Sequence, residues 1–344
     1  MNRVLERITE SQLDQVREHS AEIGREHRKD MRGFERRLRN RYRVALDQLE
    51  CLLWLCVDEG GTLNQRCRPA ARDTNDLVFD ALTRLHARGC LVCSDVLALL
   101  RTGHADGAMA RWRSLHETAV TAMFISKHGR DTAERFLLHD RIKSYEDAKV
   151  YQEHCEKLDY EKFSDAEMEN LKEQHDTLVN QFEPEYAGGN GWASHALRNA
   201  TPPHKGRVNF GDLEKDVGIP HFQPYYHMAS HHVHSGAKSI RFSLGVIGLT
   251  DILSAGPSNA GLADPGQNTA MSLGSLTATL LSYQVSKEKE IEDGFHGAAM
   301  LQTIHTLVTE CVNSWLVADK KLKDDEKRRV ARAKSQSAKK TSPS

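Results

Sequence analysis

The chain has 344 residues and a formal net charge of −1, with 39% hydrophobic and 6% aromatic residues. This length suffices for one large domain or two ordinary ones with a real core, and the balanced charge excludes a uniformly polycationic protein. Seven cysteines, an odd number in mostly apolar surroundings, are typical of reduced thiols. The N-terminus lacks the apolar core of a signal peptide, and no apolar run approaches the ~20 residues of a membrane span, so we expect a cytoplasmic protein without a membrane partner.

A long helix is predicted at the N-terminus, over residues 1–60. Between Phe34 and Leu53, apolar residues recur at intervals of three and four, which is the spacing of an apolar helix face. The pair Gly60–Gly61 is expected to end this helix. The segment Arg25–Arg43 carries nine Lys and Arg residues against three Asp and Glu residues. Such a basic face is commonly a solvated helix surface, and it can also bind phosphate, so RNA is its candidate partner.

An antiparallel helical bundle is predicted from residue 70 to residue 318. Its first helix covers about Ala70–Arg101, and the next contains Ala108–Phe124. The connection between them is short, which brings consecutive helices side by side in opposite directions. Two further helices are expected near the end of this domain, at about Gln267–Glu292 and Phe295–Leu316.

Within the bundle we expect an acidic helical hairpin over residues 131–182 and an irregular loop over residues 183–217. In the hairpin, Ser164 and Glu167 have the spacing of a capping box, which marks the start of a helix. The loop is rich in glycine and proline, and loops of this length in compact domains are usually functional or disordered.

The chain ends in a basic segment, residues 320–344, with almost no large apolar residue after Val330. Such a segment buries too little apolar surface to offset the entropy lost on ordering, so we expect a disordered tail that attracts RNA. No internal repeat and no convincing strand alternation is present. The predicted fold class is therefore all-α: an antiparallel helical bundle with a long N-terminal helix, an acidic helical hairpin insertion and a disordered basic C-terminal tail.

The candidate functional residues lie on two helical stretches, Ala108–Phe124 and Tyr225–Gly236, which must meet in space. They are unusual because polar and titratable side chains are rare on helices that otherwise resemble core. The candidates are Arg111, Arg113, His116, Glu117, Ser230 and His234. Arg113 and Glu117 are four residues apart and can pair along one helix face. If the second stretch meets Glu117, the carboxylate can fix a histidine tautomer.

These residues are compatible with a structural network or with a metal site. In a structural network, Arg113 and Glu117 would link through Ser230 or His234 and fix the packing of the bundle. In a metal site, imidazoles and a carboxylate would hold zinc or iron between helices, although no paired Glu-x-x-His set is present. The ligands of that alternative site would be His227, His231, His234 and Glu117.

The third alternative is activity on RNA. Cleavage through the 2′-hydroxyl needs proton transfer and positive charge on the phosphate, which histidine and arginine supply. His116 or His234 would transfer the proton, and Arg111 or Arg113 would bind the phosphate. Glu117 and Ser230 would orient these groups, and no cofactor is expected.

The segments ADGAMARWRSLHE (Ala105–Glu117) and SHHVHSG (Ser230–Gly236) resemble the two motifs, RxLHE and SxxVH, of an uncharacterised bacterial family of helical proteins of unknown function. The resemblance extends over about Ala70–Leu316 and implies no established activity. The residues that match its motifs are Arg113, His116, Glu117, Ser230 and His234.

Arg111 and His116 also spell R-x4-H, which resembles the signature of the HEPN superfamily (higher eukaryote and prokaryote nucleotide-binding). Many members are all-helical, dimeric, metal-independent ribonucleases of toxin or phage-defence systems. This resemblance implies an endoribonuclease or RNA binder without a cofactor, and a homodimer as its assembly.

Overall fold

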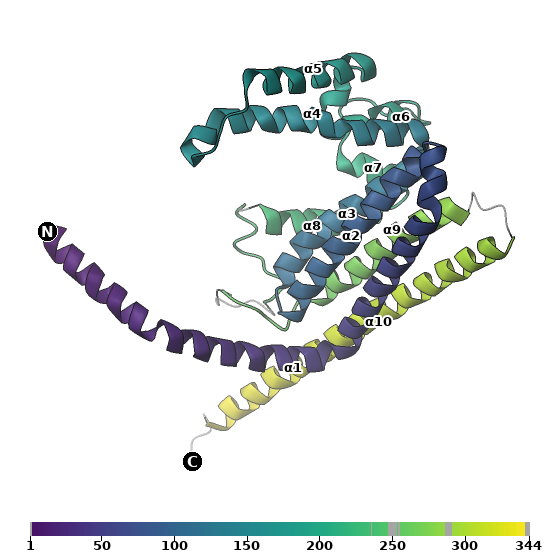
Figure 1. Cartoon of the computed structure of the whole chain (residues 1–344). Coiled ribbons are helices and arrows are strands. Elements are labelled where there is room, and N and C mark those ends of the chain that lie inside the picture. Colours follow the sequence, from purple (N-terminus) through teal and green to yellow (C-terminus); the bar gives the residue numbers. More distant parts are fainter. Residues whose placement is uncertain (1, 235, 247–252, 254, 286–290, 341–344) are drawn as a thin grey trace.

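The computed structural model describes residues 2–234, 236–246, 253, 255–285 and 291–340. Within these residues the regular structure is helical and no strand is present, which confirms the predicted all-α class. Figure 1 shows a bundle of long helices from which the start of the first helix and a helical hairpin project. None of the helices in the described ranges is long and apolar enough to cross a membrane.

The first helix, α1, covers Asn2–Asp73 and confirms the predicted long N-terminal helix. Its first part is exposed and projects from the bundle (Figure 1), whereas Leu49 and Leu52 are fully buried in the core. The predicted end at Gly60–Gly61 is wrong, because α1 continues through both glycines. An inner glycine costs a helix only about 1 kcal/mol relative to alanine, and the burial of Leu63 one turn later helps to offset this cost.

Four more long helices complete the bundle: α2 (Leu77–Arg101), α3 (Ala105–His128), α9 (Ala263–Val285) and α10 (Ile291–Lys340). The boundary between α1 and α2 lies at Asp76 rather than near residue 70, because its carboxylate accepts a hydrogen bond of 3.1 Å from the backbone N–H of Phe79 and caps α2. Gly103, at φ 82°, makes the tight connection to α3 that the sequence predicts. Trp112 of α3 and Trp315 of α10 are fully buried in this core.

The predicted acidic hairpin is formed by α4 (Arg130–His154) and α5 (Asp165–Phe182), which pack against each other beyond the bundle (Figure 1). The capping box is present: the Ser164 hydroxyl accepts from the backbone of Glu167, and the Glu167 carboxylate accepts from the backbone of Ser164. Leu178 and the end of α5 are buried, so the base of the hairpin joins the core.

The segment predicted to be irregular contains short helices that pack down on the bundle. They are η2 (Pro184–Ala187), η3 (Gly191–Ala193), α6 (Ser194–Arg198) and α7 (Phe210–Asp216). After η4 (Pro220–Phe222), helix α8 covers Gln223–Val233. Helices α7 and α8 both contact α3, which also packs against α2, α9 and α4. The two halves of the candidate site therefore meet at the α3–α8 contact.

The basic C-terminal segment differs from the prediction of disorder, because α10 continues through residues 320–340. Leu322 is only 6% exposed, and the carboxylate of Asp325 pairs with Arg41 of α1 at 2.9 Å. These contacts anchor the start of the segment, and its Lys, Arg and Ala residues favour helix where packing ends. The last predicted tail residues, 341–344, lie outside the described residues.

Candidate functional site

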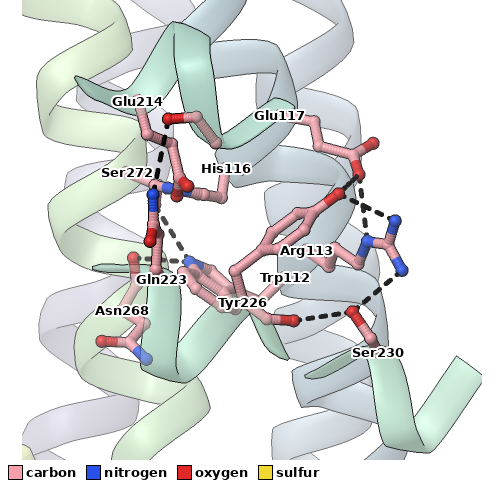
Figure 2. Close-up of polar contacts among 11 residues, drawn as sticks. Trp112, Arg113, His116, Glu117, Glu214, Gln223, Tyr226, Ser230, Asn268 and Ser272 are labelled. Carbon is pink, nitrogen blue, oxygen red and sulfur yellow. Dashed lines mark hydrogen bonds and ion pairs between the residues drawn. The ribbon is translucent and has the colours of Figure 1, made fainter. Parts of the chain in front are cut away.

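Arg113 is the centre of a polar network between α3 and α8 (Figure 2). Its Nε donates to Glu117 Oε1 at 3.0 Å, along α3. One terminal nitrogen donates to the Ser230 hydroxyl at 3.1 Å, and the other to the Tyr226 hydroxyl at 2.8 Å. Tyr226 in turn donates to the same Glu117 oxygen at 2.6 Å, and Ser230 donates to the backbone oxygen of Tyr226 at 2.8 Å. Every nitrogen of the guanidinium therefore has a partner from this chain.

The network also fixes the plane of the guanidinium, which lies over the Tyr226 ring with its carbon 4.5 Å from the ring centre. Burial works to lower the pKa of Arg113, but the Glu117 carboxylate and the Tyr226 hydroxyl outweigh it and raise that pKa. Burial, and then the adjacent Glu117 carboxylate, raise the pKa of Tyr226. At neutral pH the guanidinium is thus charged and the phenol protonated, as this hydrogen-bond pattern requires.

His116 lies on the same helix but in a separate, closed environment. Its Nε2 is 2.8 Å from Glu214 Oε1, and the two side chains are 2% and 1% exposed. The imidazole stacks on the Trp112 indole at 5.1 Å between ring centres, and Phe222 covers it at the same distance. The second carboxylate oxygen of Glu214 has no hydrogen-bond partner in the described part of the chain. This pair lies beyond the reach of a large substrate.

Trp112 connects this closed environment to α9 (Figure 2). Its indole N–H lies 3.0 Å from both the backbone oxygen of Asn268 and the hydroxyl of Ser272. Tyr226 closes the other side, with its ring 6.3 Å from His116 and stacked on Phe210 at 4.6 Å. The Arg113 network and the His116–Glu214 pair therefore share Tyr226 as their boundary.

The remaining candidate residues do not converge on these two groups. Arg111 points to α2, where its Nε and a terminal nitrogen contact Asp95 Oδ2 at 2.9 and 2.8 Å. His234 is exposed at the C-terminal end of α8, and its backbone N–H donates to the Ser230 oxygen at 3.1 Å. The structure thus brings Arg113, Glu117 and Ser230 together but leaves Arg111 and His234 outside.

The alternative metal site does not form in the described residues. These ranges contain no group of three or more His, Cys, Asp or Glu side chains that could hold a metal ion. His227 is exposed, and among the described residues no hydrogen bond or ring contact joins it to His231, His234 or Glu117. Ligands for zinc would have to converge at about 2 Å from one point, so the four residues proposed for that alternative cannot share an ion in this conformation.

Two residues of the site, Tyr226 and Glu214, are absent from the sequence-based set. Tyr226 had a usable signal, because it stands four residues before Ser230 and shares its helix face. Glu214 gave none: it comes from the seven-residue helix α7, which is too short for an apolar period to show.

The arrangement is suited to holding α8 on α3 rather than to proton transfer. A general base needs access to the proton that it removes, and His116 is sealed beneath aromatic rings with its imidazole engaged by Glu214. Arg113 is partly exposed, at 24% of its side chain, and Glu117 at 40%, and each guanidinium nitrogen of Arg113 already donates one hydrogen bond within the chain. The contacts of Arg113 and Ser230 therefore join α3 to α8.

Comparison with known proteins supports the resemblance to a family of unknown function, over a shorter range than the predicted Ala70–Leu316. No curated protein and no solved structure matches the chain significantly. The segment that does match contains both motifs, most of α2 and all of α3 to α8, and it excludes α1, α9 and α10. Residues 79–247 match the model of a family of unknown function, DUF5677.

Proposed function

We propose that the protein binds RNA without cleaving it, through basic segments of α1 and α10. The first is Arg25–Arg43, in which all the basic side chains except the half-buried Arg41 are exposed. The second is residues 320–340, with ten Lys and Arg residues against three Asp and Glu residues. Lysine and arginine on one surface attract the phosphate backbone and release its counterions, which is the main source of sequence-independent affinity.

The observation that carries this proposal is that the two segments start from one contact. Arg41 of α1 and Asp325 of α10 form an ion pair of 2.9 Å, so the segments meet at the same end of the bundle. Beyond this contact both helices leave the bundle, and Figure 1 shows their ends on the same side. The 19 residues from Arg25 to Arg43 span roughly 27 Å along the helix. A single strand of RNA can therefore contact several basic side chains of each helix at once.

The ribonuclease form of the hypothesis has less geometric support. A HEPN-like site would need Arg111 and His116 at one scissile phosphate, whereas Arg111 pairs with Asp95 and His116 with Glu214. We therefore propose binding without cleavage. A role in toxin or phage-defence systems would follow only from the catalytic alternative. A non-catalytic interaction protein with a structural Arg113 network is compatible with the same geometry, because each nitrogen of the guanidinium has a partner within the chain.

Fluorescence anisotropy with a labelled single-stranded RNA tests the proposal. We expect binding that weakens with salt, with a slope of log affinity against log salt of about −4 if roughly six phosphates are neutralised. Replacing Arg36, Arg37 and Arg39 with glutamate should weaken binding at least tenfold. The matched control reverses three exposed hairpin lysines, Lys149, Lys157 and Lys172, and should leave the affinity unchanged. Equal effects of the two triple variants, or no binding by the parent, would refute the proposed surface.

Incubating RNA with the parent protein in a chelator tests the catalytic alternative. We expect the RNA to remain intact. Cleavage that survives purification and is lost in both Arg111→Ala and His234→Ala would contradict binding without cleavage. Arg111→Ala removes a half-buried ion pair with Asp95 and His234→Ala removes an exposed side chain, so circular dichroism of both variants is the control for folding.

A further inference from the structure

A groove of about 690 Å3 lies between α1 and α2, away from the α3–α8 network. This is within the range of roughly 300–1,000 Å3 that is usual for small-molecule sites. Its wall on α1 extends from Leu53 to Arg72, and its wall on α2 from Thr83 to Ser94. The groove is apolar at the Leu53 end and basic at the Arg72 end.

Two glycines of α1 shape this groove, and they do so differently. A Cβ on Gly60 would lie 2.4 Å from His86 Cε1, so this glycine is required for α1 and α2 to approach each other. A Cβ on Gly61 would have no atom within 4 Å, so close packing does not require this glycine. An inner glycine weakens a helix relative to alanine. The groove is open at Gly61 because this residue has no side chain.

The apolar end of the groove exposes large side chains to solvent. Trp54 on α1 and Leu91 on α2 are 57% and 55% exposed, and Leu53 and Val57 lie beside them in the wall. Covering this surface would contribute about 25 cal/mol for each Å2 of apolar area removed from water. The end is therefore suited to an apolar chain or ring.

The floor of the groove is uncharged at neutral pH. His86 Nε2 lies 3.0 Å from the Thr277 hydroxyl, and burial lowers the pKa of His86 to about 4. Cys90 follows one turn later, and burial raises the pKa of its thiol to about 12. A neutral imidazole and a protonated thiol do not oppose the entry of an apolar chain.

The opposite end has an excess of positive charge. It is lined by Arg68, Arg72 and Arg84, and no acidic side chain lines the groove. Arg68 and Arg84 share the single carboxylate of Asp80, at 2.5 and 2.9 Å. Arg72 has no ion pair among the described residues, so at least one guanidinium is available to an anion. Arg68 is held in place, since its Nε also donates to Asn64 at 2.9 Å.

From these features we propose that the groove binds an amphipathic carboxylate of the long-chain fatty-acid class. Its alkyl chain lies along Trp54 and Leu91, and its carboxylate pairs with Arg72 and the adjacent guanidinium groups. Trp54 and Arg68 are about 21 Å apart along α1, so the wall between them is long enough for an extended fatty-acid chain of twelve or more carbons. Guanidinium and carboxylate form paired, charge-assisted hydrogen bonds, which fixes the orientation of the ligand.

Laurate, below its micellar concentration, is a suitable probe because Trp54 reports on the groove. The other tryptophans, Trp112, Trp192 and Trp315, are 4% exposed or less. Laurate should shift the fluorescence of the full chain to shorter wavelength with saturation, and the shift should disappear in Trp54→Phe while calorimetry still detects binding. Lauryl alcohol, which lacks the carboxylate, should bind about tenfold more weakly.

Variants at the two ends of the groove complete the test. Gly61→Phe fills the groove from an open position and should weaken laurate binding at least tenfold, whereas the control Gly61→Ala should bind like the parent. Arg72→Ala should weaken laurate about tenfold and leave lauryl alcohol unchanged. Equal binding of laurate to Gly61→Phe and the parent would overturn the site, and equal binding of acid and alcohol would overturn the ligand class. Failure of laurate to bind would also overturn the fatty-acid proposal. If light scattering then shows that the parent is a dimer and that Gly61→Phe is a monomer, the groove is the contact with a second copy of the chain.

Discussion

His116→Ala should lower the free energy of unfolding by roughly 3–5 kcal/mol, because it deletes a buried aromatic ring and removes the hydrogen-bond partner of a buried carboxyl group. The carboxylate of Glu214 has no exposed surface, and its Oε2 has no hydrogen-bond partner among the described residues. The substitution would remove the hydrogen-bond partner of Oε1. Neither oxygen of the buried carboxyl group would then have a hydrogen-bond partner among the described residues. Removing the ring also opens a space between Trp112 and Phe222.

Urea denaturation followed by circular dichroism measures this effect. His234→Ala is the matched control. The imidazole of His234 is exposed and makes no hydrogen bond or ion pair with the residues that the structure describes, so its removal should change the free energy of unfolding by less than about 0.5 kcal/mol. Adding Glu214→Gln to His116→Ala should cost less than the sum of the two single changes, with a coupling of roughly 1–3 kcal/mol. A His116→Ala protein as stable as the His234→Ala protein, or strict additivity with Glu214→Gln, would refute the reasoning.

Three further predictions concern the packing of α1, α2 and α10. Burial lowers the pKa of His86 from 6.5 to about 4, so between these pH values only the unfolded chain binds this proton. The free energy of unfolding should therefore fall as the pH is lowered through this window, by up to roughly 3 kcal/mol. Other buried histidines shift in the same direction, so His86→Gln should reduce the dependence in urea titrations without abolishing it. Gly60→Ala should lower the free energy of unfolding by roughly 1–3 kcal/mol, because the added methyl group clashes with His86. Gly61→Ala should raise the free energy of unfolding by about 0.5–1 kcal/mol, which thermal denaturation will show as a higher melting temperature. Leu322→Ala should cost roughly 2 kcal/mol in urea denaturation, whereas no change would indicate that this part of α10 is not packed.

The meeting of two distant helices could be predicted from the residues that they carry. Arg113 and Glu117 stand one turn apart on an apolar helix, and such groups need partners, which Ser230 supplies on α8. The environment of each histidine could not be predicted, because residue type alone does not distinguish a sealed imidazole from an accessible one. His116 is sealed by Glu214, which comes from a short helix without a periodic signal.

Helix ends were harder to predict than helices. Gly60 and Gly61 are ordinary stop signals, but α1 passes them because α2 packs against the first and the core resumes after the second. The start of the basic C-terminal segment is ordered by two contacts, Leu322 in the core and Asp325 on Arg41. Neither the glycine contact nor these anchors can be recognised without knowing which helices are neighbours.

The unbroken course of α1 determines how the molecule behaves hydrodynamically. Its 72 residues extend over roughly 108 Å, and Figure 1 shows that a large part of this length is free of the bundle. A particle with such a rod diffuses more slowly than a sphere of equal mass, so a monomer will elute from a sizing column at the position of a larger globular protein. Light scattering or sedimentation, which report mass independently of shape, is therefore the appropriate way to count subunits.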